Sequence, residues 1–213
     1  MLDPSPPTPA AGLGAPAGAC TRLQALRARP RRAGEASFFW YEAQFGREAV
    51  KVLPGEYAAL DHELLIVTVL GSCIACCLWD RDARVGGMNH FMLPGGSSAG
   101  GRYGRFAMDR LIDELVGLGA RRRALQAKVF GGARLLAGPE GAGVGARNAR
   151  FALEYLGAAR IPVLSQDVQG SAARKIAFLP VSGRALVKRL GASHRGALLV
   201  QERAAAQRMG WPS

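Results

Sequence analysis

The chain has 213 residues, of which 49% are hydrophobic and 21% are charged, a composition that excludes a chain disordered throughout and fits one domain with tails. Of the formal net charge of +12, residues 1–34 contribute +4 and residues 184–213 contribute +5, so we expect no nucleic-acid partner, because the part between them carries little positive charge. The longest apolar run without a charged residue, 64–79, is shorter than the roughly 20 residues of a membrane-spanning helix, so we expect no membrane insertion.

The N-terminal segment has the composition of a disordered tail. Residues 1–37 are rich in proline, alanine and arginine, and half of the chain's 12 prolines lie in 1–34. Such a segment buries little apolar surface, so we expect it to stay unfolded. It shows no basic cluster ahead of an apolar core, so no secretory signal is expected, and three of the four cysteines crowd together rather than forming a spaced disulfide framework. These features predict a cytoplasmic protein with reduced thiols.

The folded part is predicted to cover 38–190, beginning at the aromatic cluster 38–41, and a loosely attached basic tail is predicted at 191–213. Apolar runs predict strands in the first half, and apolar residues at helical spacing follow after them. In chain order we predict strands at 49–53, 64–70, 73–79 and 85–93, a helix near 106–118 that ends at Gly119, a strand at 127–130, a helix at 147–159, and strands at 161–168, 175–181 and 184–190. This order indicates a single α/β domain, a layered α/β/α sandwich with a mixed β-sheet.

Two of the predicted strands carry a cysteine and a histidine that can meet. If these strands pair as a hairpin around the loop 80–83, Trp79 faces Arg84 and Cys73 faces His90. Directly opposed Cβ atoms lie about 4.5–5.5 Å apart, which lets a thiol and an imidazole come into contact. A register slip of one residue would put the two side chains on opposite faces of the sheet.

A cysteine beside a histidine is the minimum requirement for catalysis by a thiol nucleophile. A free thiol has a pKa near 8.5, so it needs an adjacent base, and an imidazole can accept its proton and later return it to the leaving group. A third group must orient the imidazole, and the hydroxyl of Thr68 on the preceding strand can serve. Backbone N–H groups around Ser72 and Cys73 can hold a developing oxyanion. The pattern therefore predicts Cys73 as nucleophile, His90 as base and Thr68 as its partner.

Two other interpretations of the cysteines stay open at this point. Cysteine is among the most buried residue types, and we expect Cys76 and Cys77 to be core residues. Cys73, Cys76 and His90 also offer three ligands for zinc. Against a zinc site, two cysteines three residues apart on an extended strand point to opposite faces.

The remaining candidates are assigned to turns and to the surface. His62 lies between two acidic residues in a predicted turn, and His194 lies in the predicted tail. Gly131-Gly132 and Gly141-x-Gly143-x-Gly145 invite comparison with a phosphate loop, but no Lys-Ser/Thr follows them. We interpret these glycines as turns and as the entry to a helix.

These residues stand in a longer pattern, and the chain resembles the CheD family of bacterial chemotaxis, the chemoreceptor glutamine deamidases. The resemblance covers about 38–190 and is spread over several ordered blocks, which makes it more specific than one short motif. The matching blocks are FGREAVKVLPGEY at 45–57, TVLGSC at 68–73, GGMNHFMLP at 86–94, RYG at 102–104, KVFGGA at 128–133, VGARN at 144–148, and Ser182-Gly183 near the end.

The resemblance implies an α/β/α sandwich and a Cys-His-Thr catalytic set, with Cys73 as nucleophile, His90 as general base and Thr68 as the hydroxyl that assists the histidine. Family members carry this threonine five or six residues before the cysteine, and here it lies five before. The chain departs from many relatives at the third place of 167–170, where they carry a glycine, and in its longer basic N-terminal tail.

The implied reaction is hydrolysis of glutamine side chains of methyl-accepting chemotaxis receptors to glutamate, through a thioester and without a cofactor. The resemblance also implies binding to a CheC-type phosphatase in some relatives. The alternative function is that of a non-catalytic chemotaxis adaptor, which would bind receptors or a CheC-type phosphatase.

Overall fold

The two central layers of the fold are β-sheets that face each other. The computed structural model describes residues 17–93, 98–135 and 143–208, and within them the chain forms four α-helices and ten strands. The first sheet, called the β4 sheet below, has the order β1 (Phe38–Glu42), β2 (Arg47–Lys51), β4 (Leu65–Leu70), β9 (Arg174–Leu179) and β10 (Arg184–Arg189). The second, called the β5 sheet, has the order β3 (Tyr57–Leu60), β6 (Val85–Phe91), β5 (Ile74–Asp80), β7 (Gln126–Gly131) and β8 (Val163–Val168). Each sheet is mixed, because it contains a parallel pair, β2–β4 in the first and β7–β8 in the second.

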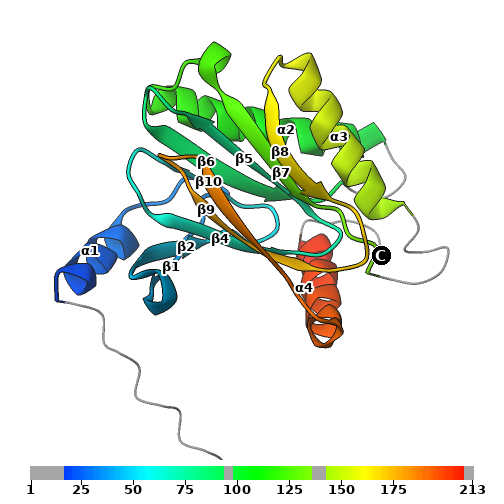
Figure 1. Cartoon of the computed structure of the whole chain (residues 1–213), viewed down its shortest axis with the longest axis horizontal. Coiled ribbons are helices and arrows are strands. Elements are labelled where there is room, and N and C mark those ends of the chain that lie inside the picture. The colour runs from blue at the N-terminus through cyan, green and yellow to red at the C-terminus, as the bar shows by residue number, and fades with distance from the viewer. Residues whose placement is uncertain (1–16, 94–97, 136–142, 209–213) are drawn as a thin grey trace, which may run out of the picture.

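Two helices cover the outer face of the β5 sheet. Helix α2 (Ser98–Gly117) lies over β6 and β3, and α3 (Val144–Ala158) lies over β7 and β5 (Figure 1). Helix α1 (Ala17–Ala28) packs beside β1 and β2, whereas α4 (Arg195–Arg208) lies at the other side of the molecule (Figure 1). Single-turn 3-10 helices occur at Ala43–Phe45, Arg122–Ala124 and Ala192–His194. In the described part of the chain, no helix combines the length and the apolarity needed to cross a bilayer.

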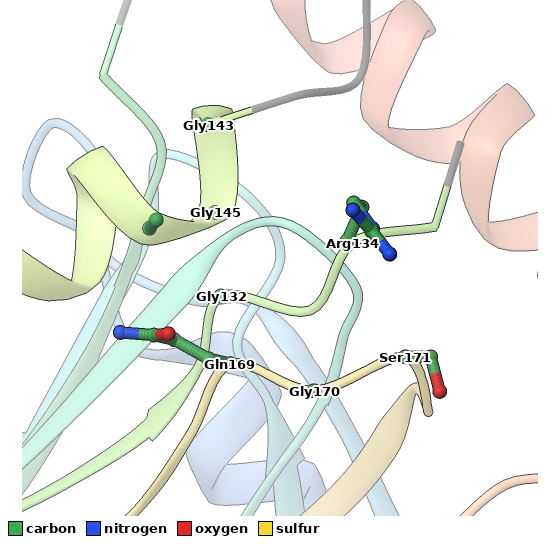
Figure 2. Close-up of a pocket in the computed structure, with 8 residues that line it drawn as sticks. Gly132, Arg134, Gly143, Gly145, Gln169, Gly170 and Ser171 are labelled. Carbon is green, nitrogen blue, oxygen red and sulfur yellow. The ribbon is translucent and has the colours of Figure 1, made fainter. Parts of the chain in front are cut away.

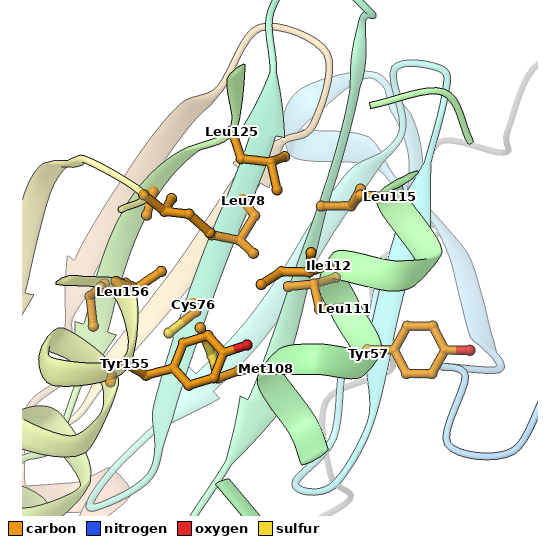
Figure 3. Close-up of a cluster of buried hydrophobic side chains, with 14 of the residues drawn as sticks. Tyr57, Cys76, Leu78, Met108, Leu111, Ile112, Leu115, Leu125, Tyr155 and Leu156 are labelled. Atoms are coloured by element: carbon orange, nitrogen blue, oxygen red, sulfur yellow. The ribbon is translucent and has the colours of Figure 1, made fainter. Parts of the chain in front are cut away.

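Strand β5 lies at the centre of the molecule and is buried on both faces. Cys76 and Leu78 point toward the helices, where they pack in one cluster with Met108 (Figure 3). Cys77, which lies between them in the sequence, faces the β4 sheet and shares a cluster with Phe178. A strand buried on both faces has an unbroken apolar run rather than an alternating pattern, which explains the longest apolar run of the sequence.

The predicted α/β class with layered, mixed sheets is confirmed. Every strand and helix predicted between 49 and 190 is present, with ends that differ by a few residues, except that α2 begins several residues earlier. The strands divide into two facing sheets, whereas the sequence had suggested one mixed sheet. The sequence does not predict strands β1 and β3, because β3 has only four residues and the aromatic cluster in β1 indicates only where the ordered part begins.

Residues 17–37 are ordered, and the prediction of a disordered tail is wrong for them. Helix α1 buries Leu23, and the guanidinium of Arg27 donates a hydrogen bond of 2.7 Å to the carbonyl oxygen of Phe39. The composition hid this helix because it is short and lies between Pro16 and Pro30 in a segment rich in proline and arginine. Residues 1–16 lie outside the described residues.

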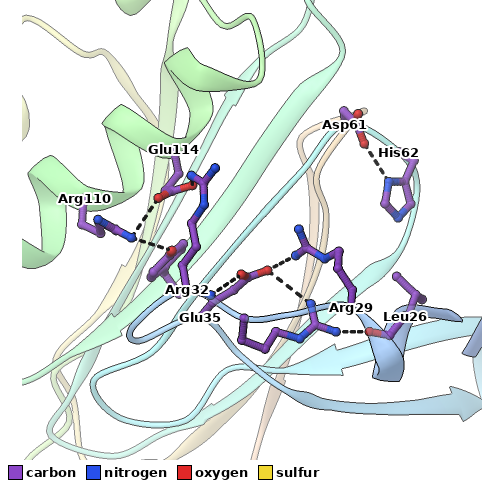
Figure 4. Close-up of polar contacts among 10 residues, drawn as sticks. Leu26, Arg29, Arg32, Glu35, Asp61, His62, Arg110 and Glu114 are labelled. Atoms are coloured by element: carbon purple, nitrogen blue, oxygen red, sulfur yellow. Dashed lines mark hydrogen bonds and ion pairs between the residues drawn. The ribbon is translucent and has the colours of Figure 1, made fainter. Parts of the chain in front are cut away.

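The arginines after α1 form ion pairs with acidic side chains at the surface. Glu35 forms an ion pair with Arg29 (Figure 4). Arg32 forms an ion pair with Glu114 of α2, and Glu114 also pairs with Arg110 over 3.1 Å. Each such pair at the surface contributes only about 0–1 kcal/mol. Together they connect the segment after α1 to the helix layer of the domain.

The C-terminal segment is also attached to the domain, and the prediction of a loose tail is wrong for residues 191–208. Leu198, Glu202 and Ala205 of α4 are buried. Spacings of four and three residues place these side chains on one face of a helix. Residues 209–213 lie outside the described residues, and the boundaries of the domain stay a prediction.

Candidate active site

His90 and Cys73 share one face of the β5 sheet, but they are not directly opposite each other. His90 pairs with Ala75, so the predicted register is wrong by two residues. The connecting loop has the predicted four residues but lies one position later, at 81–84, because pairing ends at Asp80 and Val85, and the Asp80 carboxylate accepts two backbone N–H groups of the loop. Since side chains on a strand alternate, a slip of two residues keeps them on the same face, and Cys73 becomes a diagonal neighbour of His90.

Thr68 reaches across from the β4 sheet and holds the imidazole of His90. Its hydroxyl donates to the carbonyl oxygen of Val52 over 2.7 Å and lies 2.8 Å from Nδ1 of His90. A hydroxyl has one proton, so Thr68 accepts at Nδ1, and Nδ1 therefore carries the imidazole proton. The Val52 carbonyl oxygen, 3.3 Å from Nδ1, requires the same tautomer because it can only accept. The neutral ring is left with an unprotonated Nε2.

Nε2 of His90 is buried and has no hydrogen-bond partner among the described residues. Burial lowers the pKa of His90 to about 4, opposed by the hydrogen bond to Val52 and assisted by the charge of Lys51. The imidazole is therefore neutral at pH 7, and the electron pair on Nε2 can accept a proton. A buried polar atom without a partner reduces stability, and such atoms are more frequent at functional sites than in ordinary cores.

The turn that carries Cys73 is fixed by the end of β7. The N–H of Gly132 donates to the carbonyl oxygen of Cys73 over 2.8 Å, and the N–H of Ala133 donates to that of Gly71 over 2.7 Å. Gly131 has a φ of 111°, and a Cβ at this position would lie 2.1 Å from the Cys73 carbonyl oxygen. Only glycine fits such a close approach. The predicted turn at Gly131-Gly132 is thus present, and it sets the position of Cys73.

Asn148 of α3 orients the peptide bond between Ser72 and Cys73. Its side chain is fully buried, donates to the Ser72 carbonyl oxygen over 2.8 Å and accepts from the N–H of Leu93 over 3.0 Å. The C=O and N–H of a trans peptide point in opposite directions, so this contact turns the N–H of Cys73 away from α3. The resemblance included Asn148 in a matching block but gave it no role, and its one sequence signal is a polar residue on the buried face of a predicted helix.

The N–H groups of the turn bind the carboxylate of Glu202 in α4. Oε1 accepts from the N–H of Gly71 over 3.2 Å and from that of Cys73 over 3.3 Å, and Oε2 accepts from the Ser72 hydroxyl over 2.6 Å. Two converging N–H groups beside a thiol form the arrangement of an oxyanion hole. Donors near Ser72 and Cys73 were predicted, but Glu202 was missed, because it is 131 residues from Gly71 and lies in the segment that composition marks as a tail.

The thiol of Cys73 is fully buried, and its pKa is raised well above its ordinary value. The largest cause is burial, followed by the charge of Glu202 and a hydrogen bond to it. Tyr103 of α2 lies close enough for the charge of Cys73 to raise its pKa, after the larger effect of burial. The structure thus brings Thr68 and His90 into direct contact and places Cys73 on the same face, with the Glu202 carboxylate beside the cysteine and no partner at Nε2 among the described residues.

Cys76, Cys77 and His62 lie where the sequence places them. Cys76 and Cys77 are fully buried core residues. Cys76 packs under the helices and Cys73 packs between the sheets, so the two thiols point to opposite faces and do not form a joint zinc site. His62 bonds to a neighbouring aspartate at the surface, and His194 is exposed.

A cavity of about 500 Å³ opens beside the turn that fixes Cys73 (Figure 2). It is lined by Gly132, Arg134, Gly143, Gly145, Ala146, Gln169, Gly170 and Ser171, and neither Cys73 nor His90 is among its lining residues. Gly143 caps α3 and Gly145 lies in its first turn, as predicted for a helix entry, and Gly141 lies outside the described residues. A smaller cleft of about 80 Å³ on the side of α2 has His90 and Tyr103 among its lining residues.

Known proteins resemble this chain over most of its length. The family model described as "CheD chemotactic sensory transduction" matches residues 92–189. A protein of Albidiferax ferrireducens named "Probable chemoreceptor glutamine deamidase CheD 1" is 55% identical over 188 residues, which cover 87% of this chain and 80% of that protein. A protein of the same name from Dechloromonas aromatica is 49% identical over 76% of this chain and 84% of its own length. Among solved structures, the Bacillus licheniformis hypothetical protein YfiH aligns with 54% of this chain and 49% of its own, at a TM-score of 0.36 and 13% identity.

Proposed function

The chain belongs to the CheD family, and from this premise we propose that it is a protein-glutamine deamidase, which hydrolyses glutamine side chains of methyl-accepting chemotaxis receptors to glutamate and ammonia. The names of its relatives support the reaction and the class of substrate. The observation that carries the proposal is the state of His90. Thr68 fixes its proton on Nδ1, and its bare Nε2 is buried on the face that holds Cys73.

The first step is attack by Cys73 on the carboxamide carbon of the substrate. The thiol turns from Glu202 toward Nε2 of His90, which takes its proton, and the sulfur electron pair forms a bond to carbon while the carbonyl π pair moves onto oxygen. The N–H groups of Gly71 and Cys73 hold the resulting oxyanion, which is worth about 10²–10³ in rate per donor. The carbonyl then re-forms, the C–N bond breaks, and the proton on His90 goes to the departing ammonia.

The second step hydrolyses the thioester. His90 takes a proton from a water molecule, and the water oxygen attacks the thioester carbon. The C–S bond breaks, and the proton returns from His90 to the sulfur of Cys73. The net reaction consumes one carboxamide and one water and releases one carboxylic acid and one ammonia, without a change in oxidation state, so the chemistry requires no cofactor.

Thr68 acts as a positioning residue in both steps. It touches neither the substrate nor the sulfur in this scheme, but it keeps Nε2 unprotonated and fixes the plane of the ring. A cytoplasmic location and a CheC-type phosphatase as second partner are part of the proposal. Their support is the resemblance to the CheD family.

The test is mass spectrometry of a purified receptor fragment after incubation with wild type, Cys73→Ala and Cys77→Ala. Cys77 is the matched control, because it is a fully buried cysteine on the same face of the same sheet. We expect wild type and Cys77→Ala to convert receptor glutamine to glutamate and Cys73→Ala to convert none. Conversion by Cys73→Ala at the wild-type rate would contradict the proposed mechanism.

The same samples also test the adaptor alternative. Binding of the receptor fragment is measured for wild type and Cys73→Ala side by side. We expect both proteins to bind, because Cys73→Ala removes one buried atom without disturbing the surface. A wild-type protein that binds the receptor and converts no glutamine would replace the enzyme by the adaptor.

A further inference from the structure

We propose that α4 occupies the candidate active site and inhibits the enzyme. The helix places the carboxylate of Glu202 where the glutamate product would lie. This inference rests on the proposed deamidase function. It goes beyond that function because it concerns a segment of this chain rather than the substrate, and it predicts a reaction of the chain with itself.

The contacts of Glu202 are those expected of a bound product. It is 7% exposed, and it forms no ion pair with a basic side chain in the described part of the chain. Burying a carboxylate without a positive partner is unfavourable unless hydrogen bonds replace the lost water. Here the bonds come from the N–H groups of Gly71 and Cys73 and from the hydroxyl of Ser72. The turn that carries the nucleophile is therefore already built to hold a carboxylate.

This occupancy suppresses the chemistry in two ways. First, the N–H groups of Gly71 and Cys73 cannot stabilise a substrate oxyanion while Oε1 of Glu202 accepts from both. Second, the charge of Glu202 and its hydrogen bond to the thiol add to the effect of burial and keep the pKa of Cys73 well above its ordinary value. A substrate that displaces Glu202 releases the donors and the thiol together.

The attachment of α4 is narrow enough to be reversible. Besides Glu202, only Leu198 and Ala205 are buried among the α4 side chains whose burial the structure describes, and Val200 is 69% exposed. Leu198 packs in a small cluster with Leu135. Gly71 leaves room for this docking, because a Cβ there would lie 2.7 Å from Oε1 of Glu202 and 2.3 Å from the Leu135 side chain.

The position of Glu202 predicts self-deamidation in the Glu202→Gln variant. The carboxamide is nearly isosteric with the carboxylate, so its oxygen takes the place of Oε1 between the two N–H groups. Cys73 forms a bond to the side-chain carbonyl carbon of residue 202, ammonia leaves with the proton held by His90, and water then cleaves the thioester and returns the proton to sulfur. The product is the wild-type side chain, Glu202.

The experiment is mass spectrometry of the α4 peptide from purified Glu202→Gln, with Glu202→Gln/Cys73→Ala as control, in water labelled with heavy oxygen. We expect residue 202 to be glutamate carrying one labelled oxygen in the first protein and to remain glutamine in the second. Gln201 and Gln207 lie in the same helix and serve as internal controls. Both must remain glutamine, because spontaneous deamidation would convert them as well as residue 202, whereas the proposed reaction converts residue 202 alone.

The outcome separates this inference from the proposed function. If the carboxamide at residue 202 stays intact in a Glu202→Gln protein that still deamidates the receptor fragment, the product-like seating of α4 is overturned while the enzyme function stands. If neither that carboxamide nor the receptor is converted by a folded protein, the enzyme function itself fails.

Alkylation of Cys73 by iodoacetamide gives a second, independent measurement. We compare wild type with Glu202→Ala and with Val200→Ala, a control on the exposed side of α4. We expect alkylation of Cys73 to be faster in Glu202→Ala than in wild type, because the variant lacks the charge and the hydrogen bond that help to raise the pKa of the thiol. An alkylation rate equal to that of wild type would overturn the occlusion by α4.

Discussion

At the scale of single residues, the proposed chemistry depends on which nitrogen of His90 carries the proton. The Thr68 hydroxyl uses its only proton in a hydrogen bond to the Val52 carbonyl oxygen, so it accepts a hydrogen bond from Nδ1 of His90. These two contacts decide the tautomer of the imidazole. The contact joins the two sheets, because Thr68 belongs to β4 and His90 to β6. His90 is thus held in place by the packing of the two sheets rather than by a loop.

Replacing Thr68 by valine is expected to reduce the deamidation rate by about 5- to 150-fold, which corresponds to the loss of a buried hydrogen bond worth about 1–3 kcal/mol. Valine keeps the shape but leaves Nδ1 of His90 with only the longer contact to Val52. Thr68→Ser is the control, since it retains the hydroxyl and should keep most of the rate. The measurement is kcat and KM on a receptor fragment, and an equal loss in both variants would contradict the positioning role.

The stability of the protein should depend on the protonation of His90. Its pKa is about 4 in the folded chain, against an ordinary value of 6.5, so the unfolded chain binds the proton first as pH falls. The contribution of neutral His90 to the free energy of unfolding is complete above pH 6.5, decreases between pH 6.5 and about 4, and is lost below about pH 4. The shift corresponds to about 3 kcal/mol at 1.36 kcal/mol per unit.

Urea unfolding of wild type and His90→Gln at a series of pH values between 4 and 7 measures this contribution. We expect the free energy of unfolding of wild type to fall more steeply toward low pH than that of the variant. Identical pH dependence in the two proteins would show that His90 is not a buried neutral base.

At the scale of elements, the site depends on one close approach between β7 and the turn before β5. Gly131 has a positive φ, and its Cα lies against the carbonyl of Cys73. A side chain there meets backbone, which cannot move aside as a flexible side chain can. Two glycines that the sequence presents only as a turn therefore control the position of Cys73, the proposed nucleophile.

Gly131→Ala is expected to destabilise the protein by more than about 2 kcal/mol and to lower the deamidation rate, because it combines strain at a positive φ with a clash against Cys73. Gly157→Ala in α3 is the matched control. No atom lies within 4 Å of a Cβ at Gly157, so alanine should raise stability by about 0.5–1 kcal/mol and leave the rate unchanged. Thermal unfolding of both variants measures the difference, and equal stabilities would contradict the close approach.

The elements themselves could largely be predicted, and the reason lies in their local periodicity. Leu111, Ile112 and Leu115 mark the buried face of α2, and the apolar run before Asp80 marks two strands that are buried on both sides. The hairpin register could not be predicted, because it depends on how the Asp80 carboxylate turns the loop. The error did not move Cys73 off the face of His90, since strand side chains repeat every two residues.

At the scale of the whole molecule, the two sheets share a core that positions the site. Phe178 of β9 is fully buried on the inner face and lies 6.2 Å, between ring centroids, from Trp79 of β5. Long-range pairings of this kind have no local signal, so the sequence indicated strands but not their division into two sheets. For the same reason the docking of α1 and the contact between Glu202 and the Cys73 turn could not be predicted.

Phe178→Ala is expected to lower the free energy of unfolding by about 3–5 kcal/mol, as large-to-small changes in cores do. Phe38, which is 59% exposed on β1, is the matched control, and Phe38→Ala should cost about 1 kcal/mol or less. Urea unfolding of the two variants tests the packing of the sheets. A similar cost for both would mean that Phe178 does not lie between the two sheets.

The claim on which the function depends is that Cys73 and His90 act as one unit. The most direct test is the rate of receptor deamidation by Cys73→Ala, His90→Ala and the double variant, measured beside wild type. Residues that act as a unit show strongly non-additive losses. We expect each single variant to lose at least about a thousandfold in rate and the double variant to lose no more than either single one. A His90→Ala variant within about tenfold of wild type, or a double variant far slower than both single variants, would contradict the claim.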